Sequence, residues 1–304
     1  MIRMKGAGDP VWGVPYFGNL AAMALLAANE ARPNPPDVRR AERWLSWYAK
    51  NQEADGAIFD REGTVAAYKS NGRRDATDSY AATFLLAVWR FRQATGTAPQ
   101  PAITEAARKS LAAIEAVVQP DGLTIAKPDY PMKYLMDNIE VHGGLREAAL
   151  FFHSAGLEIE AGKADRLAAR LAGSLPGFWS EKDQCFAVAL DGKGVFTSGL
   201  RKSYPDGLAQ LFALAHVPPV RPALWRKMRQ SFKPGDEGVP VERWLMAATR
   251  CAGPKEIDAL RQATRKAMLE FTVNAVYVER PALAILALLD GKARLPDVRA
   301  VIGK

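Results

Sequence analysis

Hydrophobic positions recur with a helical period along the whole chain, in two alternating kinds of segment. In residues 35–51, 101–118 and 159–175, apolar side chains return every three or four positions between charged ones, which predicts helices with one wet side. The second kind is apolar on nearly every side and must therefore be covered on every side. Segments of this kind are 17–28, 79–89, 208–215, 244–252 and 282–289. The alternation predicts buried inner helices wrapped by half-exposed outer ones.

Proline and glycine positions support the same division. Prolines stand where the outer helices would begin, and glycines follow the inner ones. These residues are Pro36, Pro101, Pro222 and Pro254, and Gly96, Gly156, Gly253 and Gly291. The predicted inner helices start on average about 52 residues apart, which is room for two helices of about 11 or 12 residues and their turns.

Six such helical hairpins that close on themselves would form an all-α (α/α)6 toroid. The Gly-rich polar segments between the helices suit short β-hairpins in its loops. A helical bundle and an open solenoid of hairpins fit the same pattern. No linker or break in composition appears, so we expect one domain over residues 1–304. Only the segment LPDVRAVIGK, residues 295–304, remains to supply the sixth outer helix.

Composition narrows the class of protein. Of the 304 residues, 48% are hydrophobic, which is enough for a sizeable core, yet the apolar runs are shorter than the roughly 18 residues of a membrane span. The first residues lack the apolar stretch of a secretory signal, so a cytoplasmic location is the default expectation. Cys185 and Cys251 stand singly among apolar residues, and the three histidines are dispersed. We expect reduced thiols and neither a metal nor another cofactor.

The formal net charge of +8 raises nucleic acid as a partner. The lysines and arginines are scattered over many amphipathic segments and form no stripe with aromatic residues, which argues against nucleic acid. An acidic polysaccharide or an anionic small molecule suits the same charge. We expect a monomer without a nucleic-acid partner.

In a toroid of this kind, the N-terminal ends of all inner helices meet at one mouth. Each predicted end carries an aromatic residue, and five of them carry an acid. The aromatic residues are Tyr16, Tyr80, Tyr134, Tyr204, Trp244 and Tyr277, and the acids are Asp75 with Asp78, Asp137 with Glu140, Asp206, Glu242 and Glu279. Acids are also favoured in a first helical turn as caps, and DATD, residues 75–78, resembles a capping box. A structural role for these acids is therefore an open alternative.

The stretch YPMKYLMDNIEVHGG is harder to explain by capping. We expect the helix to begin before Asp137, so that Asp137 and Glu140 lie beyond the cap and share one face with Tyr134. The neighbouring stripe holds Asn138 and His142, for which a hydrogen-bonded core position is the alternative. Two buried carboxylates so close together are costly unless they are paired or solvated. A wet cleft explains them best.

Two carboxylates that face each other across an aromatic cleft are the equipment of glycoside hydrolysis. One protonates the leaving oxygen, while the other activates water or attacks the sugar. The aromatic rings offer flat apolar faces to sugar C–H groups. Cations beside the same helix ends would hold a carboxylate or sulfate of the substrate. They are Arg73, Arg74, Arg201, Lys202 and Arg280.

The chain resembles the six-hairpin glycosidases over most of its length. ATDSYAATFLLA is similar to the A-[ST]-D signature of family 8 endoglucanases, which maps their sugar-binding aspartate onto Asp78, while Tyr80 stands where the signature has a second aspartate. The general-acid glutamate of that family has no counterpart in VWGVPYFGNLAA. YLMDNIEVHGGL is similar to the helix of unsaturated glucuronyl and rhamnogalacturonyl hydrolases that carries their acid/base aspartate, which points to Asp137.

We therefore predict a glycosidase that acts on an oligo- or polysaccharide, acidic polymers and exopolysaccharides included, and the resemblance implies inversion. Asp137 is the expected acid/base, Asp78 its partner or the residue that holds the reacting sugar, and Glu140 the alternative acid. The expected substrate-binding residues are Asp75, Tyr16, Tyr80, Tyr134, Asn138, His142, Tyr204, Asp206, Trp244, Tyr277 and Glu279.

Two other functions stay open. A polysaccharide lyase on the same fold would use Tyr134 or Tyr204 together with His142 as proton carriers. A toroid without catalysis would serve as a carbohydrate-binding or assembly protein, and the missing family 8 glutamate favours this alternative.

Overall fold

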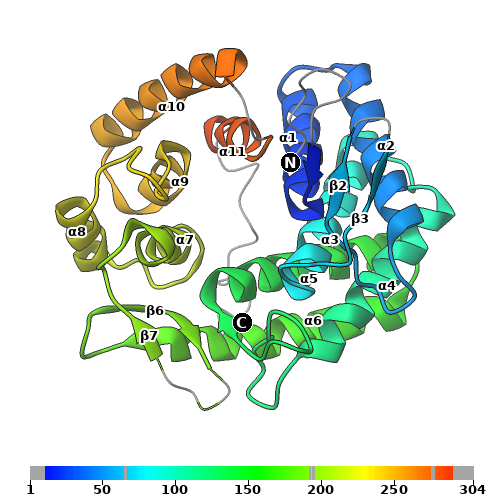
Figure 1. Ribbon diagram of the computed structural model, residues 1–304, viewed down its shortest axis with the longest axis horizontal. Helices are drawn as coiled ribbons and strands as arrows, with labels where there is room; N and C mark the ends of the chain where they lie inside the picture. Colours follow the sequence, from blue (N-terminus) through cyan, green and yellow to red (C-terminus); the bar gives the residue numbers. More distant parts are fainter. Residues whose placement is uncertain (1–10, 65–66, 192, 194–195, 275–277, 290–304) are drawn as a thin grey trace.

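The computed structural model describes residues 11–64, 67–191, 193, 196–274 and 278–289. Within these ranges the chain is mostly helical, and the helices lie in two concentric layers (Figure 1). No helix described here is both long enough and apolar enough to cross a membrane.

The inner layer is a closed ring of helices. They are α1 (Pro15–Ala31), α3 (Asp78–Thr95), α5 (Leu135–Ser154), α7 (Leu208–His216), α9 (Val241–Cys251) and α11 (Glu279–Leu288). Each helix packs against the next in this order, and α11 packs against α1 (Figure 1). This closure confirms the predicted toroid and excludes an open solenoid.

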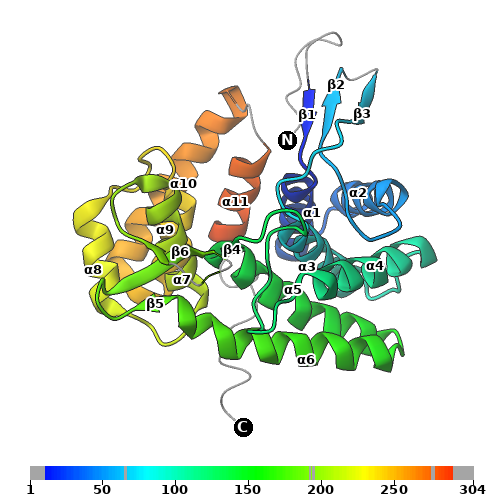
Figure 2. The same cartoon turned by 60° about the horizontal axis from the view of Figure 1, so that its bottom comes forward.

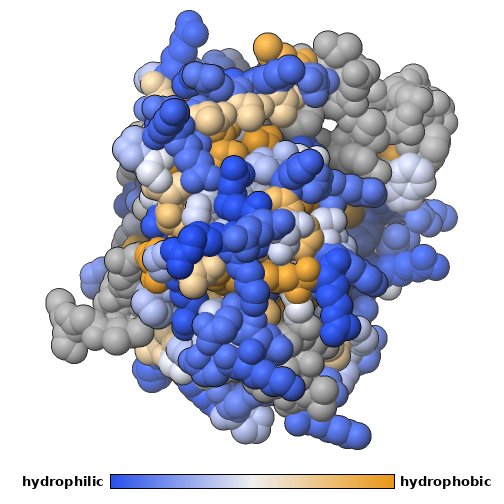
Figure 3. All heavy atoms as spheres, turned by 90° about the vertical axis from the view of Figure 1, so that its left-hand side faces the viewer, coloured by the Kyte–Doolittle hydropathy of each residue, from blue (hydrophilic) through white to orange (hydrophobic). Residues whose placement is uncertain are grey.

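The outer helices lie against the outside of the ring. They are α2 (Pro35–Asn51), α4 (Pro101–Val117), α6 (Glu158–Ser174), α8 (Pro222–Ser231) and α10 (Pro254–Asn274). All but α6 begin with a proline. Proline lacks a backbone N–H, and this costs nothing in a first turn, where N–H groups have no acceptor within the helix. On the side that carries α8 and α10, hydrophilic residues dominate and apolar ones form narrow strips between them (Figure 3).

The segment expected to form the sixth outer helix lies outside the described residues, as does Gly291. The expectation of one domain over residues 1–304 therefore stays a prediction.

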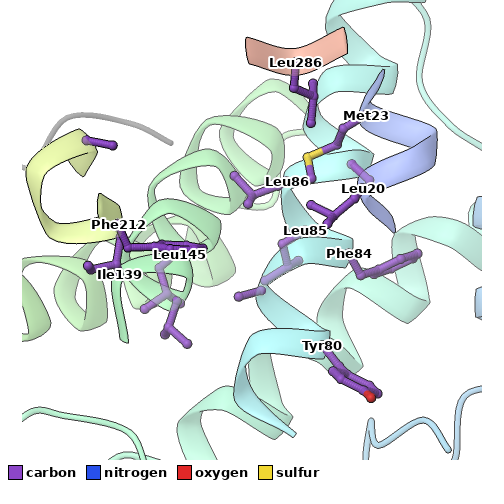
Figure 4. Packing of buried hydrophobic residues seen from close by; sticks show 14 of the residues in the cluster. Leu20, Met23, Tyr80, Phe84, Leu85, Leu86, Ile139, Leu145, Phe212 and Leu286 are labelled. Atoms are coloured by element: carbon purple, nitrogen blue, oxygen red, sulfur yellow. The ribbon is translucent and has the colours of Figure 1, made fainter. Parts of the chain in front are cut away.

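Apolar side chains fill the space within and between the layers. Figure 4 shows part of this core, where Leu20 of α1, Leu86 of α3 and Leu286 of α11 approach one another around the ring axis. Burial of each such side chain contributes about 1.5–3 kcal/mol. Gly144 of α5 lies so close to α3 that an added Cβ would be 2.6 Å from the Ala82 carbonyl oxygen. The core thus holds the inner helices together, with α3 and α5 in the tightest contact.

Two small antiparallel sheets occupy the loops, as the Gly-rich segments predicted. β1 (Val11–Gly13), β2 (Arg61–Gly63) and β3 (Tyr68–Ser70) pair in this order beyond one end of α1 (Figure 2). In the second sheet β6 (Cys185–Leu190) pairs with β4 (Lys133–Tyr134), β5 (Trp179–Ser180) and β7 (Phe196–Ser198). A 3-10 turn at Leu175–Phe178 precedes β5, and a π turn at Ser203–Gly207 precedes α7. Because β4 ends where α5 begins, this sheet holds the start of α5.

Candidate active site

The N-terminal ends of the inner helices surround a cleft made of two adjoining cavities. The deep pocket has a volume of about 330 Å³, and all six inner helices or the turns before them contribute to it. Its lining includes Tyr16, Tyr80, Glu140, Phe212, Arg243 and Glu279. The tyrosine groove has a volume of about 410 Å³, and its lining includes Lys127, Tyr130 and Tyr134. Both cavities are lined by Asp75, Met136, Asp137 and Tyr204, which mark their junction.

Asp137 stands at this junction, in the first turn of α5. The sequence predicted an earlier helix start, and this was wrong, because the residues of β4 pair with β6 and α5 begins only at Leu135. Burial raises the pKa of Asp137 well above its usual value, and the carboxylates of Asp78 and Asp75 raise it further. These effects favour the protonated carboxyl that a general acid needs.

Glu140 lies one turn further along α5 and lines the deep pocket. Tyr16 of α1 donates a hydrogen bond of 2.5 Å to its Oε1. Burial raises the pKa of Glu140 to about 8, although the hydrogen bond from Tyr16 and the charge of Arg243 lower it. A pKa of about 8 favours the protonated form of Glu140 at neutral pH. Burial also raises the pKa of Glu279, against the lowering effect of Arg243.

Asp78, the first residue of α3, does not reach the cleft. Its side chain is 0% exposed and lines neither cavity. Its Oδ2 accepts a hydrogen bond from Thr124 Oγ1 (2.7 Å), and its Oδ1 accepts one from the Ser79 N–H (2.8 Å). Burial raises the pKa of Asp78 to about 7. This placement differs from the expected contact with sugar, because the loop before β4 covers the carboxyl group.

Asn138 completes the same network from α5. Its side-chain amide donates to the carbonyl oxygens of Thr124 (3.1 Å) and Tyr134 (2.9 Å), and its Oδ1 accepts from the Thr124 N–H (2.8 Å). Asn138 is fully buried and thus also lies away from the expected position in the cleft. Thr124 joins the first turns of α3 and α5. We call Asp78, Thr124 and Asn138 the loop clamp.

Tyr80 lines the deep pocket from α3, and its hydroxyl donates to Asp60 Oδ1 (2.9 Å). Asp60 lies just before β2, and its pKa is raised by burial and, to a smaller extent, by the nearby charge of Asp75. Asp75 itself is exposed to solvent at the junction of the two cavities. Asp60 is not among the residues predicted from the sequence, because its loop has no helical pattern.

The tyrosine groove presents aromatic faces. The rings of Tyr130 and Tyr134 stack with centroids 6.5 Å apart, and their hydroxyls are 3.3 Å apart. Tyr204 is 62% exposed on the opposite segment, before α7. The Lys127 ammonium donates to the Arg74 carbonyl oxygen (3.1 Å) and lies 5.9 Å from the centre of the Tyr130 ring. The groove therefore offers stacking surfaces next to a cation.

Other predicted substrate-binding residues lie away from the cleft. His142 is buried within α5 and lines neither cavity. Trp244 is fully buried, where its ring meets the edge of Trp225 with centroids 5.3 Å apart. Asp206 accepts two hydrogen bonds from backbone N–H groups of the loop before it, at Arg201 and Lys202, so it has a structural contact of the general kind that was left open. Tyr277 lies outside the described residues.

The cation of the deep pocket is Arg243, which is not among the cations predicted from the sequence. Of the predicted cations, Arg280 forms an ion pair with the buried Glu242 and is not free to bind a ligand. Arg243 directly precedes Trp244 at the start of α9, so its position was a usable signal. Consecutive helical residues point about 100° apart, and the neighbours of α9 turn Arg243 to the pocket and Trp244 to the core.

Over the ranges that the structure describes, no group of three or more His, Cys, Asp or Glu side chains is arranged to hold a metal ion. Cys185 in β6 and Cys251 at the end of α9 are free thiols. The polar side chains that line the cleft carry carboxyls, phenols, a serine hydroxyl, a guanidinium and an ammonium.

No protein-family model matches the chain, and no curated protein matches it. Solved structures match its fold. A reducing end xylose-releasing exo-oligoxylanase has a TM-score of 0.61 and 14% identity, over 96% of this chain and 84% of its own. A novel alpha-amylase from Clostridium perfringens has a TM-score of 0.60 and 8% identity, over 92% and 87%. A rhamnosidase from Klebsiella oxytoca has a TM-score of 0.56 and 14% identity, over 92% and 57%.

The fold is therefore that of the six-hairpin glycosidases. The predicted resemblance to them is confirmed at the level of the fold, while the identity to these structures is only 8% to 14%.

Proposed function

We propose that this protein is a glycoside hydrolase, which cleaves a glycosidic bond at the junction of the deep pocket and the tyrosine groove. The strongest support is the position of Asp137, a carboxyl group with a raised pKa that lines both cavities. A general acid must reach the oxygen between two sugar units, so it has to stand where the sites for these units meet. The fold shared with an exo-oligoxylanase and a rhamnosidase is compatible with this class.

Hydrolysis needs a second carboxylate, and we assign this role to Asp75. It lines both cavities together with Asp137, and its exposure to solvent suits a group that activates water. We propose inversion, as the resemblance to six-hairpin glycosidases implies, with a water molecule that attacks the sugar face opposite to the leaving group. Asp78 then acts through Asp137, whose pKa it raises from its buried position in the loop clamp.

The other cleft residues bind the two parts of the substrate in this proposal. Tyr16, Glu140 and Tyr80 contact the sugar in the deep pocket, where Glu140 can donate a hydrogen bond because it is protonated. Tyr134 and Tyr204 offer their rings to the sugar units in the groove. Aromatic faces of this kind contribute apolar contact area without a net charge.

The experiment is a test of turnover on a panel of soluble neutral and acidic glycans, read as release of reducing ends. Asp137→Asn and Asp75→Asn are expected to lose about 10²–10⁴ of the rate on any glycan that the wild type cleaves. Asp258→Asn, on the exposed side of α10, is the matched control and should keep full activity. Circular dichroism of each variant establishes that it is folded.

Three outcomes would contradict the proposal. Full activity of both Asp137→Asn and Asp75→Asn would remove the assigned roles. Products with a new ultraviolet absorption would indicate a lyase. Glycan binding by the wild type without turnover on the whole panel would select the non-catalytic alternative.

A further inference from the structure

Arg243 is an almost completely buried cation in the wall of the deep pocket. It is 8% exposed, and it lines both the deep pocket and a smaller void of about 40 Å³. The centre of its guanidinium is 4.1 Å from the centre of the Phe212 ring, and its Nη1 is 4.0 Å from the Met246 sulfur. Among the residues that the structure describes, no carboxylate forms an ion pair with Arg243.

Two other arginines of the inner helices are paired. Arg90 lies 3.7 Å from Glu147, and Arg280 pairs with Glu242. A buried cation is costly unless an opposite charge and hydrogen bonds compensate its lost hydration. The carboxyls of Glu140 and Glu279 are near enough for Arg243 to lower their pKa values. Neither of them forms an ion pair with the guanidinium, so the contacts of Arg243 described above are with an aromatic ring and a sulfur atom.

We infer that the sugar bound in the deep pocket carries an anionic group, a carboxylate or a sulfate, and that Arg243 binds this group. The inference deepens the proposed function, on which it rests for the kind of ligand. The planar guanidinium matches two oxygens of either anion with parallel hydrogen bonds. Glu140 accepts the Tyr16 hydrogen bond at Oε1, which leaves Oε2 of its carboxyl group to donate to the same ligand.

The competing explanation is that Arg243 serves only as a counter-charge that stabilises the folded chain. That explanation predicts a large loss of stability in Arg243→Met and no effect on the choice of sugar. An anion-binding Arg243 predicts the reverse, because removal of an uncompensated buried cation relieves a desolvation cost. The two explanations thus differ in thermal stability as well as in binding.

The test measures binding of three uronates by calorimetry: D-glucuronate, D-galacturonate and D-mannuronate. Each is compared with its neutral parent sugar, and glucose 6-sulfate distinguishes a sulfate from a carboxylate. We expect at least one anionic sugar to bind the wild type about tenfold more tightly than its neutral parent, as a charged hydrogen-bonded pair does. In Arg243→Met this preference should fall to about twofold or less, and in Arg243→Lys part of it should remain.

The control is Arg226→Met on the exposed side of α8, which should keep the full preference. Arg243→Lys keeps the charge and reports on binding if Arg243→Met does not fold. Equal binding of anionic and neutral sugars by the wild type, an unchanged preference in Arg243→Met, or no sugar binding would overturn the inference. Turnover of neutral glycans without an anionic preference would overturn it and leave the hydrolase proposal standing. Preferred binding of anionic sugars without turnover of any glycan would support the inference on Arg243 and overturn the hydrolase proposal.

Discussion

The two halves of the cleft differ in how they hold their polar groups. The deep pocket takes them from helix ends and surrounds them with protein, so that burial raises the pKa values of Glu140 and Glu279. The tyrosine groove takes its residues from loops and leaves Tyr130 and Tyr204 exposed. Buried carboxyls with raised pKa values can change protonation state near neutral pH, whereas exposed rings offer stacking surfaces. Under the proposed function, this difference places the chemistry at the junction and in the deep pocket, and the affinity for sugar in the groove.

The largest effect is expected for Asp137→Asn, which should lower kcat by about 10²–10⁴ and change KM little. The loss should be much smaller on a nitrophenyl glycoside, because this leaving group departs without a proton. Steady-state kinetics on both kinds of substrate measure the contrast. An equal loss on both would show that Asp137 is not the acid and would remove the distinction between the two halves.

The next effect is on stability, and it concerns the buried core around the cleft. Trp244→Ala should lower the free energy of unfolding by about 3–5 kcal/mol, because the fully buried ring leaves a cavity. Tyr204→Ala, on the exposed rim, should change it by less than about 0.5 kcal/mol. Urea unfolding of the two variants tests this. A mild effect of Trp244→Ala would mean that the ring is not packed as described.

The deep pocket should also make stability depend on pH. The pKa of Glu140 is raised in the folded chain, so the stabilisation from its proton is present below its unfolded pKa and is lost as pH rises through about 8. Each group of this kind contributes up to about 1.4 kcal/mol per pH unit. Between the unfolded and the folded pKa of Glu140, the free energy of unfolding of Glu140→Gln should therefore depend less steeply on pH than that of the wild type.

Asp78 and Glu147, with pKa values raised to about 7, keep part of the slope in Glu140→Gln. Tyr16, Asp137, Arg243 and Glu279 face Glu140 from α1, α5, α9 and α11, and remain in the variant. Glu237→Gln, in the exposed loop before α9, is the control and should leave the slope unchanged. A slope that Glu140→Gln does not alter would contradict the raised pKa.

The smallest effect belongs to the groove. Tyr134→Ala should weaken binding of a glycan by about 0.5–1.5 kcal/mol, as the loss of one aromatic contact does, and should leave kcat nearly unchanged. Tyr134→Phe, which keeps the ring and loses the hydroxyl near Tyr130, is the matched control. If Tyr134→Ala lowers kcat and leaves KM unchanged, the groove takes part in chemistry and the comparison fails.

The fold was readable from the sequence because its signal is long and repeated. Most inner helices contain a segment that is apolar on nearly every side, the outer helices are apolar on one side, and burial of these faces is compatible with few arrangements. The start of α5 was not readable, because the pairing of Lys133 and Tyr134 with β6 depends on residues more than fifty positions away. Local propensity carries no information on such a contact.

The candidate site was readable in part, for a related reason. The sequence indicates that Asp137 and Glu140 share a face, since their spacing alone decides this. It does not indicate to which side Asp78 turns, because Thr124, 46 positions away, decides that. Nor does it tell whether Arg243 or Trp244 faces the pocket, because the rotation of α9 is set by the helices around it. The face that two residues share can thus be predicted from their spacing within one helix, whereas contacts between distant segments cannot be predicted from local sequence.

The loop clamp has a consequence for engineering of this scaffold. Because Thr124 is bonded to both Asp78 and Asn138, the segment that borders the groove cannot be exchanged alone. A chimera that receives a foreign segment would leave two buried polar groups each short of a hydrogen bond, which costs more than a poorly fitting surface loop. A segment that is exchanged at this edge to change specificity should therefore be transferred together with the residues at positions 78, 124 and 138, so that their hydrogen bonds are kept.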